Sequence, residues 1–245
     1  MTLPNGYILY RGPSMIDGVS IVVIGTGFSK ASTNNKTKNM IQTWILLEDV
    51  APNIAIHTGE DESICGNCAM RGIIVDGRNI ERPCYVKTFQ APLSIWKKYQ
   101  RGGYTFLDTY ERFAGRKLRL GSYGDPAAVP LQYWTAAVNK AAGITGYSHQ
   151  YASSPKFASV TMASADNSQA RAAAKKLGFR TFRVMTNNDK LESGEILCPA
   201  SKEAGHKTTC DSCGLCAGNM ANRKRTVPDI AIYAHGSGAG AFARA

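Results

Sequence analysis

The arrangement of the cysteines constrains this chain more than any other feature of its sequence. Seven cysteines occur among the 245 residues, and an odd number in a chain of this length does not suit a disulfide framework. They fall into two groups, one between residues 65 and 84 and the other between residues 198 and 216. The spacing predicts cysteine-rich metal-binding loops over residues 60–90 and 198–216.

The second cysteine group consists of Cys198, Cys210, Cys213 and Cys216. Two residues between cysteines let both thiolates face one ion, a geometry that serves zinc and iron–sulfur clusters alike. The tandem C-x2-C-x2-C run is typical of ferredoxin-type iron–sulfur sites, whereas zinc knuckles are usually separated by a longer loop. With Cys198 as the fourth ligand, the set is complete. We expect a 4Fe-4S cluster here, with zinc as the alternative.

The first cysteine group consists of Cys65, Cys68 and Cys84, and is therefore one ligand short of four. Such a set either borrows a fourth ligand or leaves one coordination position open, as a catalytic metal requires. The candidate fourth ligands are His57, His149 and His235. The sequence leaves the choice among them, and between a closed and an open site, undecided.

Positive charge is the second strong feature of the chain. The formal net charge is +11, and much of the excess lies between residues 71 and 119. A basic face attracts polyanions, of which nucleic acid is the commonest, although a solvated basic surface is the simpler interpretation. The residues concerned are Arg71, Lys87, Lys97, Lys98, Arg101, Arg112, Arg116, Lys117 and Arg119.

The chain carries no pattern that predicts export or membrane insertion. Its first residues lack a charged segment followed by an apolar one, and no apolar run approaches the ~20 residues of a membrane span. We expect a soluble cytoplasmic protein with no membrane partner. The sequence does not indicate the oligomeric state.

Strand and helix patterns alternate over residues 116–233, which indicates βα units and a mostly parallel sheet. We expect one α/β domain over residues 1–235, built on a partial or closed (β/α) barrel-like sheet. The glycine- and alanine-rich residues 236–245 are expected to form a flexible tail. Strands are predicted over residues 19–24, 40–47, 116–120, 144–150, 157–162, 179–185 and 230–233, and helices from residue 93 and over residues 129–142 and 168–177.

Several polar residues lie in segments of the kind that follow strand ends, where parallel α/β folds carry their functional loops. They are Asp125, His149, Asp166, Cys198 and His235. The alternative explanation for the aspartates is helix capping, since N-caps also favour Asp and Ser after a strand. The polar loop after the first apolar strand contains neither a P-loop nor a dinucleotide-binding fingerprint.

The chain resembles uncharacterised bacteriophage proteins related in pattern to the phage gene product 88 family. The resemblance covers nearly the whole chain and implies a phage origin, hence the cytoplasm of an infected bacterial host, but no settled activity. Its pieces are Asn35-Lys36-Thr37, Met40 to Trp44, Ile64 to Cys68, Cys84-Tyr85-Val86, Gly121 to Asp125, Gly146 to His149, Met162-Ala163-Ser164, Cys198 to Cys216 and Ala234-His235-Gly236.

A more distant similarity is to radical S-adenosylmethionine enzymes, which hold a cluster with three cysteines and leave one iron free for the cofactor. Here the first cysteine group matches in number, but fifteen residues separate Cys68 from Cys84. The similarity implies that this group holds the cluster and that S-adenosylmethionine is a cofactor. It further implies that Tyr85, Gly121 and Gly124 bind the cofactor, and that Asp125 and His149 are catalytic pocket residues.

Two functional hypotheses follow from the sequence. The first is an iron–sulfur protein of phage type, in its sharpest form a radical S-adenosylmethionine-like enzyme acting on nucleic acid or a nucleotide. The second is a zinc-stabilised protein without catalysis, which binds nucleic acid through the basic residues 71–119 or serves as a structural phage protein.

Overall fold

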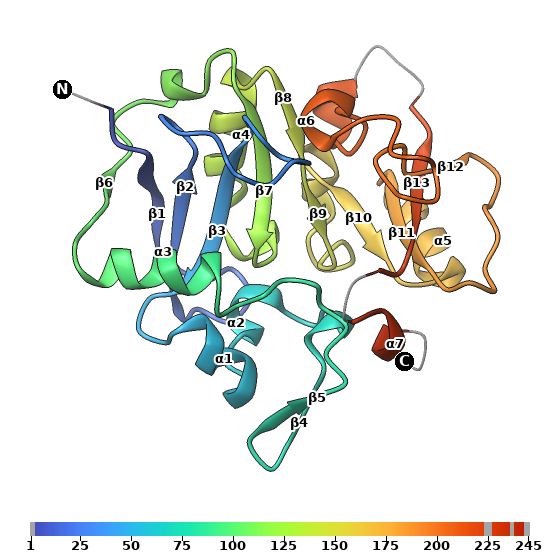
Figure 1. Ribbon diagram of the computed structural model, residues 1–245, viewed down its shortest axis with the longest axis horizontal. Helices are drawn as coiled ribbons and strands as arrows, with labels where there is room; N and C mark the ends of the chain where they lie inside the picture. Colours follow the sequence, from blue (N-terminus) through green and yellow to red (C-terminus); the bar gives the residue numbers. More distant parts are fainter. Residues whose placement is uncertain (1–2, 223–226, 236–237, 243–245) are drawn as a thin grey trace.

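The computed structural model describes residues 3–222, 227–235 and 238–242. Most of its strands belong to two sheets that follow each other along the molecule (Figure 1). The first sheet has the order β6-β1-β2-β3-β7-β8 and the second the order β12-β13-β11-β10-β9. The first contains β1 (Gly6–Pro13), β2 (Ser20–Thr26), β3 (Ile41–Leu47), β6 (Thr105–Phe106), β7 (Lys117–Tyr123) and β8 (Gly143–Thr145). The second contains β9 (Tyr147–Ser148), β10 (Met162–Ala165), β11 (Thr181–Met185), β12 (Glu195–Leu197) and β13 (Asp229–Tyr233).

The remaining elements connect these strands or lie beyond their ends. A small hairpin is made of β4 (Ile73–Val75) and β5 (Arg78–Ile80). The α-helices are α1 (Pro52–Thr58), α2 (Glu62–Cys65), α3 (Ala91–Gln100), α4 (Leu131–Lys140), α5 (Ser168–Lys176), α6 (Cys210–Cys213) and α7 (Ala239–Phe242). Short 3-10 helices are η1 (Ala69–Arg71), η2 (Tyr110–Phe113), η3 (Pro126–Ala128), η4 (Pro155–Ser159) and η5 (Asn219–Asn222).

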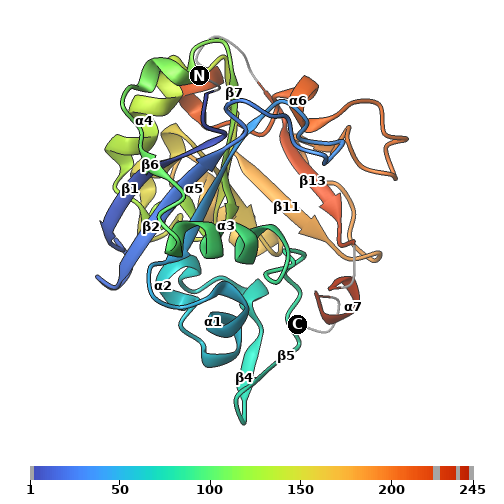
Figure 2. The same cartoon turned by 60° about the vertical axis from the view of Figure 1, so that its left-hand side comes forward.

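The parallel α/β character expected from the sequence is confirmed. Strands β3, β7 and β8 run parallel, and so do all the paired strands of the second sheet, while β1, β2 and β3 pair antiparallel. Strands β2 and β3 are continuous β-branched and apolar runs, as expected of strands covered on both faces. Helices α4 and α5, which connect parallel strands, lie on one face of the sheets, and the 198–216 segment lies on the other (Figures 1 and 2).

A single glycine joins the two sheets. Gly146 separates β8 from β9; its N–H donates to the carbonyl of Cys216 (3.0 Å) and its carbonyl accepts from the N–H of Met162 (2.9 Å). A Cβ at this position would lie 3.0 Å from the Cβ of Leu120. The predicted strand over residues 144–150 is therefore two short strands, and the chain segment of Cys216 occupies the break.

The structure corrects other sequence predictions. The strand predicted over residues 157–162 is wrong: Pro155 opens a 3-10 helix, and the strand begins only at Met162. Proline at the first helical position fixes the backbone dihedral there, and Phe157 and Val160 face the core without strand periodicity. The strands β1 and β12 and the helix α1 were not predicted.

The two sheets do not close into the expected barrel in the described part of the chain. Within the described part of the chain, β6 and β12 end their sheets as edge strands, so the sheets stay open. Of the expected flexible tail, residues 236–237 and 243–245 lie outside the described residues, and Ala239–Phe242 forms α7. None of the helices in the described ranges combines the length and apolarity that crossing a bilayer takes.

A buried ion-pair network fixes β12 against the second sheet. Arg183 donates two hydrogen bonds to the carboxylate of Glu195, at 2.9 and 2.6 Å, and their side chains are 1% and 0% exposed. Arg171 lies 3.1 Å from the same carboxylate and 3.0 Å from Asp229 of β13. Because β12 leads directly into Cys198, this network also positions the start of the second cysteine group.

Candidate functional site

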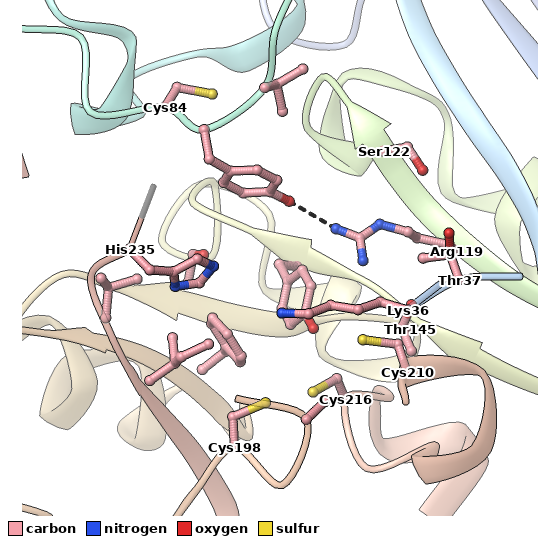
Figure 3. Close-up of a pocket in the computed structure, with 18 of the residues that line it drawn as sticks. Lys36, Thr37, Cys84, Arg119, Ser122, Thr145, Cys198, Cys210, Cys216 and His235 are labelled. Carbon is pink, nitrogen blue, oxygen red and sulfur yellow. Dashed lines mark hydrogen bonds between the residues drawn. The ribbon is translucent and has the colours of Figure 1, made fainter. Parts of the chain in front are cut away.

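A cavity of about 570 Å³ lies between the two cysteine groups. Its lining includes Cys68 and Cys84 from the first group and all four cysteines of the second. Figure 3 shows Cys84 on one side of the cavity, Cys198, Cys210 and Cys216 on the other, and Arg119 and Lys36 beside them. Two segments more than one hundred residues apart in sequence therefore face one space.

The first cysteine group is held at the carboxyl ends of β7 and β9. The N–H of Asp125 donates to the carbonyl of Ile64 (2.6 Å), and the side-chain amide of Gln150 donates to the carbonyl of Cys65 (3.0 Å). The N–H of Cys84 donates to the carbonyl of Met70 (3.1 Å), which brings the second half of the loop back to the first. Figures 1 and 2 show α1, α2 and the β4–β5 hairpin gathered below this edge of the sheets.

Gly66 permits this close approach. Its φ is +58°, and a Cβ there would lie 2.5 Å from the side-chain amide of Gln150. Arg71 fixes the same turn by pairing with Asp61 (2.9 Å) and donating to the carbonyls of Gly59 and Gly66. The C-x2-C turn is thus tied both to the sheet and to its own flanking loop.

Asp125 and His149, predicted as catalytic, lie next to this group. The carboxylate of Asp125 accepts hydrogen bonds from the N–H of Ala127 (2.9 Å), the hydroxyl of Ser148 (2.7 Å) and the N–H of His149 (2.8 Å). Asp125 is the N-cap of η3, so the capping alternative is confirmed for it. Its buried carboxylate holds the backbone of the loop that carries His149.

The ring of His149 connects a thiol and a carboxylate. It is hydrogen bonded to the side chain of Cys68, and its Nε2 lies 3.3 Å from Oδ1 of Asp166. Burial lowers the pKa of His149, but Cys68 and Asp166 outweigh burial and raise it well above its usual value. Asp166 does not cap α5; Asn167 does, by accepting from the N–H of Ala170.

The thiols of the first group lie within electrostatic reach of one another. Burial raises the pKa of Cys65 well above its usual value, and Cys68 and Cys84 act in the same direction. Burial also raises the pKa of Cys84, against the effect of Arg82. Clustered thiols resist ionisation in a dry site unless a cation compensates the thiolate charge.

The second cysteine group gathers over the face of the sheets near Gly146. Cys198 follows β12 directly and donates its N–H to the carbonyl of Ala231 (2.8 Å). Cys210 and Cys213 are the ends of α6, whose N-cap is Thr209 and which ends at Gly214 with φ +67°. Gly214, in the left-handed conformation, ends the helix and lets the chain turn towards Cys216.

A buried arginine clamps the chain around Cys216. Arg180 is 9% exposed and donates to the carbonyls of Leu215 (2.7 Å), Ala217 (2.8 Å) and Pro228 (2.6 Å). Sequence reasoning did not single out Arg180, because an arginine at the start of a strand carries no local signal of a distant partner.

Two thiols of the second group have raised pKa values. Burial raises the pKa of Cys216 to about 12; the hydroxyl of Tyr147 donates to its sulfur and opposes the rise, while the other three thiols of the group add to it. Burial likewise raises the pKa of Cys198, with Cys210 and Cys213 contributing. The thiols of Cys198 and Cys216 therefore lie within electrostatic range of the other thiols of the group.

Two cations face this group. The guanidinium of Arg119 donates to the hydroxyl of Tyr85 (2.8 Å, the dashed line in Figure 3), and its pKa is raised by Tyr85, Tyr147, Cys210 and Cys216 despite burial. Lys36 also lines the cavity, and its charge lowers the pKa of Cys198.

All seven cysteines are free thiols. Within residues 3–222, 227–235 and 238–242, no three His, Cys, Asp or Glu side chains already form a group that could hold a metal ion. Metal binding at either group would therefore require the side chains to turn towards one another.

The residues predicted to bind a cofactor have structural roles. Gly121 has φ +61° and Gly124 has φ +81°; a Cβ on Gly124 would lie 2.6 Å from the Cβ of Ile45. Both glycines therefore serve the close turn after β7, and a cofactor role for them stays a prediction. Tyr85 does line the cavity, and its hydroxyl accepts a hydrogen bond from Arg119.

The three candidate fourth ligands differ in their contacts, although His149 and His235 both line the cavity. His57 lies in α1, and its Nδ1 accepts from the N–H of Asn79 (3.4 Å) in the β4–β5 hairpin. His235 lines the cavity after β13, with Nδ1 3.0 Å from the carbonyl of Tyr233. Of the three, the described contacts join only His149 to a cysteine of the first group.

The basic residues between 71 and 119 are distributed over several elements, and many serve internal contacts. Arg112 pairs with Asp108 (2.5 Å), and Arg116 donates to the carbonyls of Gly27, Phe28 and Asn39. Lys117 donates to the carbonyl of Asp211. A nucleic-acid partner therefore stays a prediction that these contacts do not support.

No protein-family model, curated protein or solved structure matches the chain.

Proposed function

We propose that this chain is an iron–sulfur protein whose cluster is held by Cys198, Cys210, Cys213 and Cys216 beside a ligand-binding cavity. The observation that carries the proposal is that these four free thiols all line the same cavity. Four thiolates are the usual ligand set of a 4Fe-4S cluster, and the tandem C-x2-C-x2-C spacing favours iron–sulfur over zinc.

The surroundings of the second group suit an anionic metal centre. A cluster with four thiolates carries net negative charge, and Arg119 and Lys36 offer positive charge at the same wall. The hydroxyl of Tyr147 donates to the sulfur of Cys216, and such bonds to cluster sulfurs tune the reduction potential. The bound cluster would supply one-electron chemistry to the cavity.

The cavity suits a small organic ligand with an anionic group. Its volume of about 570 Å³ lies in the range of small-molecule sites. Trp44, Tyr85, Tyr147 and Phe182 supply aromatic surface, and Arg119 supplies a cation. A nucleotide combines a flat base with negative charge and fits this chemistry. A radical S-adenosylmethionine-like reaction would further need an open position at the first group.

Removal of one thiolate from the second group tests this proposal. Wild-type protein purified without oxygen is expected to be brown, with iron and acid-labile sulfide in equal amounts. Cys213→Ala is expected to lose most of its iron, sulfide and visible absorption, because three ligands remain. The matched control is Ser212→Ala, the neighbouring residue in α6, which should keep all three.

Retention of the full iron and sulfide content by Cys213→Ala would rule out this ligand set. Colourless wild-type protein with zinc at the second group would instead favour the zinc-stabilised alternative without catalysis.

A further inference from the structure

We propose that Cys65, Cys68, Cys84 and His149 form a closed zinc site, in which Asp166 is the positioning residue for the His149 ring. This inference concerns the first cysteine group and goes beyond the iron–sulfur proposal, which concerns the second. Three thiolates and one imidazole are a common ligand set of structural zinc.

The four side chains come from three separate segments that the fold holds together. Cys65 and Cys68 lie at the end of α2 and just after it, Cys84 lies in the loop that follows β5, and His149 follows β9. The hydrogen bonds from Gln150 to Cys65 and from Cys84 to Met70 connect these segments through their backbones. These bonds fix the backbone of the segments, so that only the side chains need to turn towards one another to close the site.

The orientation of the imidazole is also defined. Nε2 lies 3.3 Å from Oδ1 of Asp166, and the ring is also hydrogen bonded to the side chain of Cys68. Metal-binding histidines usually donate their second nitrogen to a carboxylate, which fixes the tautomer and the ring orientation. His149 and Asp166 have side chains 19% and 24% exposed, so the pair is largely shielded from water.

The backbone of His149 is fixed independently of its ring. The carboxylate of Asp125 accepts from its N–H, and the hydroxyl of Ser148 accepts from the N–H of Gln150 (3.0 Å). The ligand loop is therefore positioned before any metal binds. Such preorganisation reduces the entropy that is lost on binding.

The site also contains a compensating cation. Three thiolates around one zinc ion leave a net negative charge, and Arg82 lowers the pKa of Cys84 through its charge. The same guanidinium donates to the carbonyls of Cys84 (3.3 Å) and Val86 (3.1 Å), which orders the loop.

The competing chemistry for the same residues is a nucleophilic triad of Cys68, His149 and Asp166, in which the imidazole would act as a base. The presence of Cys65 and Cys84 near Cys68 favours the metal site, because a triad has no use for two further thiols.

The zinc affinity of the full chain tests the assignment. It is measured by competition with a chromogenic chelator, and cobalt substitution gives the spectroscopic readout. The wild type is expected to bind one zinc ion that is absent from Cys84→Ala. His149→Ala should weaken zinc binding at least about 100-fold, whereas His149→Cys should retain it with a four-thiolate cobalt spectrum. Asp166→Asn should weaken binding about 10- to 100-fold.

Matched controls separate this proposal from the other one. His57→Ala and His235→Ala should leave the zinc affinity unchanged, and His149→Ala should retain its iron and sulfide. Unchanged zinc affinity in His149→Ala would contradict the closed site. Loss of iron from His149→Ala would assign the cluster to the first group and overturn the zinc site. Absence of zinc, with rapid alkylation of Cys68 that depends on His149, would establish the triad instead.

Discussion

Glu195→Ala is expected to lower the free energy of unfolding by about 3–5 kcal/mol, the usual cost of leaving one partner of a buried ion pair uncompensated. Arg183 is 1% exposed and makes two of its hydrogen bonds to this carboxylate. Without Glu195, its remaining contacts are the carbonyl of Lys190 (2.7 Å) and Glu192 at 3.8 Å. Chemical denaturation followed by circular dichroism measures the loss.

The control is a double variant that removes both charges. Arg183→Met combined with Glu195→Leu should recover much of the lost stability, because apolar residues of similar volume can replace a buried ion pair at little cost. Equal stability of Glu195→Ala and the wild type would show that this pair is not buried as described. Because β12 leads into Cys198, Glu195→Ala should also lower the metal content of the second cysteine group.

Arg180→Met is expected to lower the free energy of unfolding by about 3 kcal/mol, since charged hydrogen bonds to three carbonyls are lost. The carbonyls of Leu215 and Ala217 flank Cys216, and Ala217 is buried. The variant should therefore also lose iron from the second group faster than the wild type in the presence of a chelator. Thermal unfolding and the rate of iron release measure the two effects.

Arg180→Lys is the matched control for charge. An ammonium group cannot reproduce the planar set of donors, so this variant should keep only part of the stability and of the iron. Iron release at the wild-type rate from Arg180→Met would show that Arg180 does not position Cys216.

The strands that the sequence predicted correctly carry runs or alternating patterns of apolar side chains. Apolar runs gave β2 and β3, and an alternating pattern gave β11. The sequence prediction missed β12, because Glu195 is polar yet buried through its pairing with Arg183. It misplaced β10, because the apolar residues 157–162 include a 3-10 turn after Pro155.

The cysteines were recognisable as candidate ligands from their spacing, but their shared cavity was not. That cavity depends on β8 and β9 crossing from one sheet to the other at Gly146, a long-range feature that spacing does not encode. The same limit applies to the fourth ligand of the first group. His149 stands out from His57 and His235 only through its contacts with Cys68 and Asp166.

Metal and sulfide analysis of wild-type protein purified without oxygen tests the central claim most directly. We predict about four iron atoms, about four sulfides and about one zinc ion per chain. Two zinc ions with neither iron nor sulfide would contradict the iron–sulfur assignment of the second cysteine group.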